Sequence, residues 1–216
     1  MYTYTHGYDD EEILIAKGQV VGGYAIGIIC MADVWYPLSP GTVENASTFN
    51  FPVYIKPIPG GVKIISSETH PDILKDTIKA GKELVEKVGC RAIVGACGYF
   101  ASYQEEVAAA LDVPVFLSSL MQVPIVMRSL RPNQKLGIIC AREEALSAAP
   151  ALKQCGVDDL SRIVIGGAQD TSQFQNLYKG TGRMNNAKWG QELADVAKRM
   201  VSNHPDVGAI VLEGSD

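Results

Sequence analysis

The sequence has no paired-cysteine motif, no cluster of basic residues and no long apolar run, and each absence excludes a class of protein. Its five cysteines form no CxxC pair and are odd in number, which indicates free thiols in a reducing cytoplasm instead of disulfides or a zinc site. The 19 Lys and Arg residues are dispersed and the net charge is −5, which argues against a nucleic-acid surface. No apolar run approaches the roughly 20 residues of a membrane-spanning helix.

Targeting and phosphate-binding motifs are also missing. Residues 1–6 have no basic region followed by an apolar one, so we expect no signal peptide and a cytoplasmic protein. Residues 180–183 (GTGR) lack the spacing of a P-loop, although Arg183 is a candidate partner for a substrate carboxylate. The three histidines have no potential metal ligands near them in sequence, so we interpret them as surface residues.

Short apolar runs alternate with segments of helical periodicity along most of the chain, and polar loops occupy 31–52 and 166–185. Such alternation predicts parallel βαβ units in an α/β fold. Residues 13–15 could add a short edge. The expected strands are 24–30, 51–58, 91–96, 113–117, 135–140, 162–165 and 207–213, and the expected helices are 69–88, 99–111, 119–130, 142–154 and 187–202.

Two short motifs recur in the same order, which indicates an internal duplication. Gly-Ile-Ile-Cys occurs at 27–30 and again at 137–140, and Ala-Ile-Val occurs at 92–94 and again at 209–211. The second motif follows an amphipathic helix each time. We therefore predict two similar Rossmann-like units with parallel sheets, related by pseudo-two-fold symmetry, with a cleft between them. The first unit would span residues 1–118 and the second residues 119–216.

Cys97 is the most suggestive single residue, because it ends an apolar strand just before a helical pattern. A thiol beside a helix N-terminus should be more acidic than the usual value of about 8.5. The repeat aligns Cys97 with Gly214 and Gly98 with Ser215. Both positions follow strand ends, where open α/β sheets bind ligands, so the two would face each other across the cleft. Cys30, Cys90 and Cys140 lie in apolar runs and are expected in the core.

Three passages resemble the aspartate/glutamate racemase superfamily, and within it the hydantoin racemase-like branch. They are Cys-Gly-Tyr-Phe at 97–100, Ser-Ser-Leu-Met-Gln-Val-Pro at 118–124, and the loop YPLSPGTVENASTFNFPV at 36–53. The resemblance implies racemisation or epimerisation of a small carboxylate or hydantoin by two cysteines. It implies no pyridoxal phosphate and no metal, and a homo-oligomer.

The resemblance also assigns roles to individual residues. Cys97 matches the first catalytic cysteine, Asn45 and Thr48 match a loop lining the substrate pocket, and Ser118 and Ser119 match a turn beside the substrate carboxylate. The serines could equally cap a helix, and Asn45 and Thr48 could equally tie their loop together through Asx and ST turns. The predicted substrate contacts are Asn45, Thr48, Gly98, Tyr99, Ser118, Ser119 and Ser215.

The chain departs from the family pattern at the second cysteine, because it has Leu-Glu-Gly-Ser at 212–215 where the family has Leu-Glu-Cys-Thr or Leu-Glu-Cys-Ser. A reaction needing an acid and a base on opposite faces of one carbon cannot run normally with one thiol. The main expectation is a racemase-like isomerase with Cys97 as one acid/base group and two-thiol activity impaired at Gly214. The alternatives are a single-cysteine lyase or decarboxylase acting on malonate-type acids, and a non-catalytic protein that binds small carboxylates.

Overall fold

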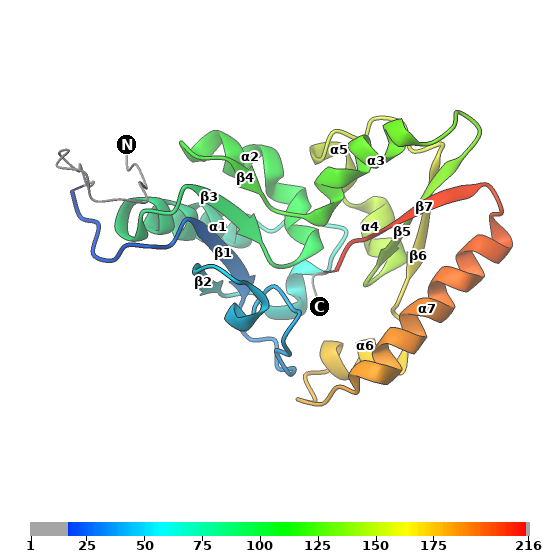
Figure 1. Cartoon of the computed structure of the whole chain (residues 1–216), viewed down its shortest axis with the longest axis horizontal. Coiled ribbons are helices and arrows are strands. Elements are labelled where there is room, and N and C mark those ends of the chain that lie inside the picture. Colours follow the sequence, from blue (N-terminus) through cyan, green and yellow to red (C-terminus); the bar gives the residue numbers. More distant parts are fainter. Residues whose placement is uncertain (1–16, 215–216) are drawn as a thin grey trace.

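The computed structural model describes residues 17–214, so the predicted edge at 13–15 and the predicted contact Ser215 lie outside the described residues. Figure 1 shows two α/β units side by side. The strands are β1 (Ile26–Met31), β2 (Val53–Ile58), β3 (Ala92–Gly95), β4 (Val115–Phe116), β5 (Lys135–Cys140), β6 (Ile163–Gly167) and β7 (Val207–Leu212). The α-helices are α1 (Pro71–Glu83), α2 (Gln104–Ala110), α3 (Val123–Ser129), α4 (Glu143–Ala148), α5 (Ala151–Gln154), α6 (Ser172–Tyr178) and α7 (Asn186–Asn203).

The two sheets share one strand arrangement. The first has the order β2-β1-β3-β4 and the second β6-β5-β7, and every pairing is parallel. In each sheet the first strand in sequence is central, and the next two strands pair on its two sides. The predicted α/β fold with two parallel-sheet units is confirmed.

The repeated Gly-Ile-Ile-Cys motif lies within each central strand, at 27–30 in β1 and at the carboxyl end, 137–140, in β5. Both strands are buried along most of their length, as expected where both faces of a parallel sheet are covered. The glycines let a helix approach closely: a Cβ at Gly27 would lie 2.9 Å from the Leu84 side chain, and one at Gly137 would meet the Met200 sulfur. Leu84 continues α1 through one π-helical turn (Leu84–Val88), and Met200 lies on α7. In both units, therefore, the motif glycine allows a helix to pack closely on the central strand.

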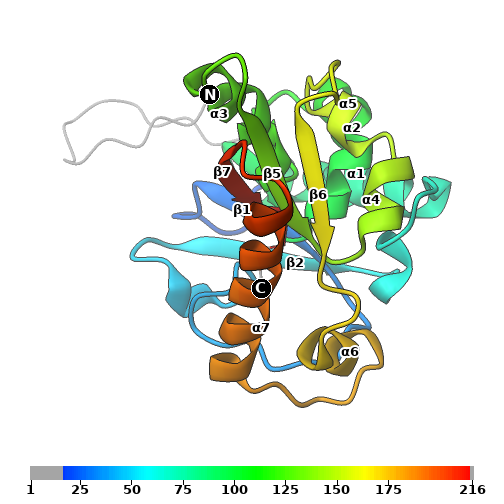
Figure 2. The same ribbon diagram turned by 90° about the vertical axis from the view of Figure 1, so that its right-hand side faces the viewer.

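The helices and loops cover the sheets differently in the two units. In the first unit α1 packs on β1 and β2, and the long loop 32–52 covers the opposite face through Val43 and Phe49. In the second unit α7 lies along the sheet, with Val196 and Met200 against Ile139 (Figure 2). A continuous apolar core joins the two units near the middle of the molecule. This packing fixes the ends of β3 and β7 relative to each other.

Three expected elements differ from the structure for identifiable reasons. The predicted helix 142–154 is broken into α4 and α5, because Ala149 precedes Pro150 and takes an extended conformation. The polar loop 166–185 contains α6, which Thr171 caps by accepting a hydrogen bond from the Phe174 backbone N–H. The expected strand 113–117 pairs over only two residues.

Candidate functional site

Cys97 is the second residue after β3, where the chain turns into a 3₁₀ helix over Gly98–Tyr103. Its side chain is partly exposed, and none of the five cysteines is in a disulfide. Gly98 lies against the end of β7, because a Cβ at this position would collide with the carboxylate of Glu213. The turn after β3 therefore packs directly on the segment that leads to Gly214.

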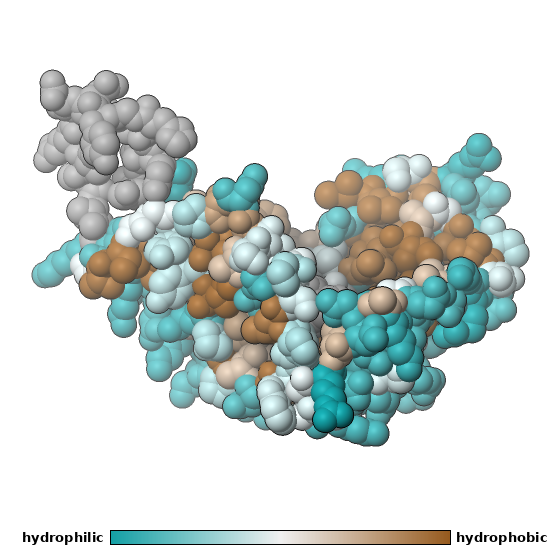
Figure 3. Space-filling model, turned by 60° about the horizontal axis from the view of Figure 1, so that its bottom comes forward, coloured by the Kyte–Doolittle hydropathy of each residue, from teal (hydrophilic) through white to brown (hydrophobic). Residues whose placement is uncertain are grey.

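Two cavities adjoin at Cys97. The smaller, of about 90 Å³, is lined by Cys97 from the first unit and by Glu213 and Gly214 from the second. The larger, of about 270 Å³, is lined by Cys97 and by residues of the loop after β1. Ile65 and Leu177 also line both cavities. The surface is hollowed between the two units (Figure 3). The structure thus brings Cys97 and Gly214 to one cavity, as the repeat predicts.

The charges around these two cavities have one sign. Among residues 17–214, no Lys, Arg or His lines either cavity, whereas Glu213 lines the smaller and Glu44 the larger. Lys63, His70 and Arg142 instead line a separate, open cavity. Glu44 was not identified from the sequence, although it directly precedes Asn45. A lone carboxylate in a polar loop has no periodicity that would have singled it out.

The other four thiols differ from Cys97 in their burial. Burial raises the pKa of Cys30 to about 11, with the nearby charge of Glu44 adding to the effect, and burial alone raises the pKa of Cys90 to about 11 and that of Cys155 to about 12. Burial, reinforced by Glu213, raises the pKa of Cys140 further still. These four stay protonated near neutrality, which fits the core role expected for Cys30, Cys90 and Cys140.

Asn45 and Thr48 use their side chains inside the long loop. The Asn45 amide donates to the Leu38 carbonyl and its oxygen accepts from the Ser47 backbone N–H. The Thr48 hydroxyl donates to the Thr42 carbonyl and accepts from the Gly41 N–H. These bonds are the loop-tying alternative considered above, and neither residue lines the cavities at Cys97. Substrate binding by Asn45 and Thr48 stays a prediction.

Ser118 and Ser119 lie on the other side of the Gly98 turn. Ser118 caps the short 3₁₀ helix Ser119–Gln122 by accepting from the Leu120 N–H, which is the capping role considered above. The Ser119 hydroxyl donates to the carbonyl oxygens of Leu212 and Glu213, and so holds the end of β7. Both serines line a third cavity that they share with Gly98 and Gly214, and Cys97 does not line that cavity.

Tyr99 and Gly214 complete the site as the structure describes it. The buried Tyr99 hydroxyl donates to the Arg142 carbonyl and accepts from the Arg142 N–H, which ties the first unit to the start of α4. No atom of residues 17–214 lies within 4 Å of a Cβ placed at Gly214, so this part of the chain leaves room for a side chain there.

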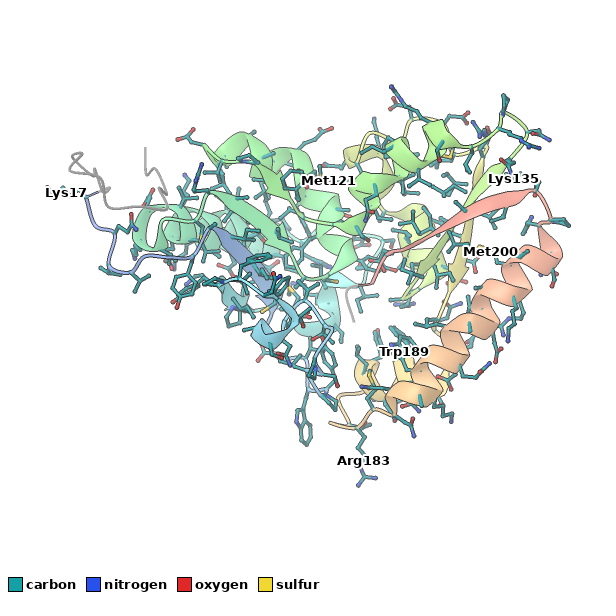
Figure 4. All side chains as sticks on the ribbon, in the orientation of Figure 1. Lys17, Met121, Lys135, Arg183, Trp189 and Met200 are labelled. Atoms are coloured by element: carbon teal, nitrogen blue, oxygen red, sulfur yellow. The ribbon has the colours of Figure 1, made fainter. Side chains whose placement is uncertain are left out.

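The structure changes the interpretation of two further side chains, Arg183 and Trp189. Arg183 is exposed and points away from the protein (Figure 4), so the structure gives no support to a substrate contact. Trp189, in the first turn of α7, was not singled out by sequence and lines the smaller cavity. Its indole N–H is buried and has no hydrogen-bond acceptor within residues 17–214. Aromatic residues at helical spacing usually indicate core, which is why the pattern did not reveal it.

Residues 17–214 contain neither a candidate metal site nor a helix suited to a membrane. No group of three His, Cys, Asp or Glu side chains between residues 17 and 214 is placed to hold a metal ion. Within that part of the chain, no helix has the length and apolar character needed to cross a membrane.

Comparison with known proteins identifies relatives of another kind than the sequence patterns suggested. No protein-family model matches the chain. A dimethylsulfoniopropionate lyase of Durusdinium sp. clade D is 29% identical over 194 residues, which cover 88% of this chain and 64% of that protein. Dimethylsulfoniopropionate lyase 6 of Emiliania huxleyi (strain CCMP1516) is 29% identical over 176 residues, covering 80% of this chain and 44% of the relative.

A third relative, dimethylsulfoniopropionate lyase 7 of Emiliania huxleyi, is 26% identical over 202 residues, or 92% of this chain and 57% of the relative. The chain spans between 39% and 64% of the length of the curated relatives that it matches. All of these relatives are lyases. The expected membership of the aspartate/glutamate racemase superfamily, and the racemase and isomerase function that came with it, are therefore wrong.

Proposed function

We propose that the protein is a lyase that eliminates a sulfide from a sulfoniopropionate-type substrate, with Cys97 as the base. The lyase names of the relatives support the reaction class. The observation that carries the proposal is the asymmetry of the site, in which one cavity wall holds a thiol and the equivalent position of the other unit is Gly214.

The elimination needs one base on one face of the substrate. The Cys97 thiolate takes a proton from the carbon next to the carboxylate, and the sulfur becomes a thiol. The electrons of that C–H bond form a carbon–carbon double bond, while the bond from the next carbon to the sulfonium sulfur breaks. Sulfur takes the electron pair of the broken bond and leaves as neutral dimethyl sulfide, with an acrylate as the second product. The thiol then returns its proton to water.

Among the described residues, Cys97 is the one thiol lining these cavities that is not buried, since Cys30 and Cys140 are, and a single accessible thiol favours elimination. Inversion at a carbon centre requires a second acid/base group on the opposite face, and Gly214 has no side chain to supply it. Elimination requires nothing there, because the product is planar and the leaving group departs with its own electrons. The glycine at position 214, which impairs a two-thiol reaction, is therefore compatible with a one-thiol elimination.

The charge of the site discriminates between the two lyase substrates under consideration. Malonate-type acids carry two negative charges, and the cavities at Cys97 offer them Glu44 and Glu213 with no basic side chain among the described lining residues. A sulfoniopropionate has a positive head group and one carboxylate. Like charges in a partly enclosed site are unfavourable, so the cavities favour the sulfonium substrate over the decarboxylase substrate.

The proposal is tested by dimethyl sulfide release from dimethylsulfoniopropionate, measured by gas chromatography with the full 216-residue chain. Wild type should release the sulfide, and Cys97→Ala should lower the rate by about 10²- to 10⁴-fold, the usual contribution of a general base. Cys155→Ala, which removes a buried thiol that lines neither cavity, is the matched control and should stay active. Release that survives Cys97→Ala unchanged would overturn the role of Cys97.

Several expectations stay predictions under this proposal. They are substrate contacts by Ser118, Ser119 and the backbone at Gly98 and Tyr99, the division of the chain at residues 118 and 119, a homo-oligomeric state and a cytoplasmic location. Light scattering of the purified chain checks the oligomeric state.

A further inference from the structure

We infer that the larger cavity beside Cys97 binds the positive head group of the substrate, and that Glu44 is the residue that selects it. This inference deepens the proposed lyase function and rests on it for the identity of the substrate. Its basis is the composition of the cavity wall. Among the described residues, Glu44 is the only charged side chain that lines this cavity.

Apart from Tyr36 and the two cysteines, the other side chains of the cavity wall are apolar, which restricts the kind of cation that the cavity can accept. Cys30, Met31, Val34 and Ile55 lie on the walls around Glu44. An ammonium ion or a metal ion needs several oxygen acceptors to replace its water shell, and these side chains provide none. A sulfonium or quaternary ammonium group presents methyl groups that carry partial positive charge and need no hydrogen bonds. One carboxylate in an apolar wall fits such an onium group.

Glu44 lies close enough to a second residue of the cavity wall, Cys30, to influence it. Its negative charge adds to the effect of burial in raising the pKa of the Cys30 thiol, which lines the same cavity. The loop around it is held in place, since Thr42, two residues earlier, donates to the Ser39 carbonyl and Asn45, the next residue, donates to the Leu38 carbonyl. The hydrogen bonds of Asn45 and Thr48 thus have a function under this inference, because they fix the loop that carries Glu44.

Because Cys97 lines both cavities, its position suggests the orientation in which the substrate binds. The smaller cavity is lined by Glu213 and by Trp189, whose buried indole N–H has no acceptor within residues 17–214 and is available to the single substrate carboxylate on the wall away from Glu213. With the onium group beside Glu44 and the carboxylate toward Trp189, the carbon chain between them passes Cys97. This places the proton to be removed next to the thiol and the departing sulfide in the larger cavity.

The inference is tested with two unreactive probes of the same shape. These are 3-(trimethylammonio)propionate, whose amine is a poorer leaving group than a sulfide, and 4,4-dimethylpentanoate, which has the same shape and carboxylate but an uncharged tert-butyl head group. Isothermal titration calorimetry on the full chain at low salt measures both dissociation constants. Wild type should prefer the ammonium probe by about tenfold or more, as expected for a partly buried charge interaction. Glu44→Gln should reduce this preference to less than about twofold.

The controls separate charge from structure. Glu68→Gln removes an exposed negative charge that lines neither cavity and should keep the full preference. Glu44→Asp keeps the charge on a shorter side chain and should keep part of the preference, which covers the case in which Glu44→Gln does not fold. Equal binding of both probes to wild type, or a preference that survives Glu44→Gln, would overturn the inference.

The same experiment is independent of catalysis. A preference that depends on Glu44, in a protein that releases no dimethyl sulfide, would sustain the onium site and refute the lyase. Sulfide release by a protein without the preference would sustain the lyase and refute the site.

Discussion

The two units end their third strands differently although the sheets have the same strand order. β3 is followed by Ala96, Cys97 and Gly98, and β7 is followed by Glu213 and Gly214. The two segments touch, since Gly98 has no room for a side chain against Glu213, whereas Gly214 faces open space. One unit thus contributes a thiol, and the other contributes a carboxylate and an empty position. Two similar units have in this way produced a site that is not symmetric, with the Cys97 thiol on one side and the Glu213 carboxylate on the other.

In the central strands, by contrast, the two units have the same residue at the equivalent position. Cys30 ends the repeated motif in β1 and Cys140 ends it in β5, and both thiols are buried. Duplication preserved a packing residue in both units, whereas the site residue is present in only one. The units therefore agree where residues form the core, and they differ at the turns that line the smaller cavity.

The largest expected effect comes from exchanging the two turn positions. In a double variant, Cys97→Gly with Gly214→Cys, the buried thiols Cys30 and Cys140 stay in place, and the added thiol lies on the other wall of the smaller cavity. Because the onium group is held from the Glu44 side, the thiol should reach the wrong face of the substrate, and sulfide release should fall about 10²- to 10⁴-fold. Recovery of release to within tenfold of wild type would show that the two positions are interchangeable.

The second expected effect separates the core thiols from the turn thiol by pH. Cys30, Cys90 and Cys155 have pKa values raised on folding, so the folded protein binds more protons than the unfolded chain between about pH 9 and 11. The contribution of these thiols to the free energy of unfolding should therefore be fully present below about pH 8.5. It should be lost as pH rises through this window, by roughly 1 kcal/mol per pH unit for each thiol.

Urea unfolding at pH 8 and pH 10 measures that loss. Cys90→Ala should lower stability at pH 8 but show a smaller loss at pH 10 than wild type. An identical loss in both proteins would mean that Cys90 does not titrate as its burial requires.

The features that sequence alone could predict are mainly those of the core, and the features that it could not predict are mainly those of the cavities. The parallel α/β fold and the repeat could be predicted because packing on a central strand demands glycine and apolar residues at regular positions, and this pattern is local. Cys97 could be found because strand ends bind ligands in such folds. Glu44 and Trp189 could not, since the cavities form only when the long loop and α7 pack beside the strand ends. The substrate depends on the charge lining those cavities, which no local pattern encodes, and so the family resemblance led to the wrong reaction.

The third prediction concerns the contact between the two turns. Gly98→Ala should destabilise the protein by about 1–3 kcal/mol, because the new methyl group collides with the buried Glu213 carboxylate. Gly190→Ala is the matched control, since Gly190 is exposed in α7 and nothing lies within 4 Å of its Cβ position. It should gain up to about 1 kcal/mol from helix propensity. Urea unfolding of both variants decides, and an unchanged stability in Gly98→Ala would mean that the turns do not pack as described.

The smallest expected effect is that of adding a thiol to the empty position. Gly214→Cys should change the free energy of unfolding by less than about 0.5 kcal/mol, because its side chain enters open space. The new thiol lines the same cavity as Cys97, so the folded variant should take up two equivalents of iodoacetamide at pH 8, where wild type takes up one and the four buried thiols take up none. Mass spectrometry of the intact chain counts the labels. Saturating 3-(trimethylammonio)propionate should slow both reactions, since one ligand occupies the cleft between the two thiols. Protection of Cys97 alone would show that the cavity shared by the two units is not where the ligand binds.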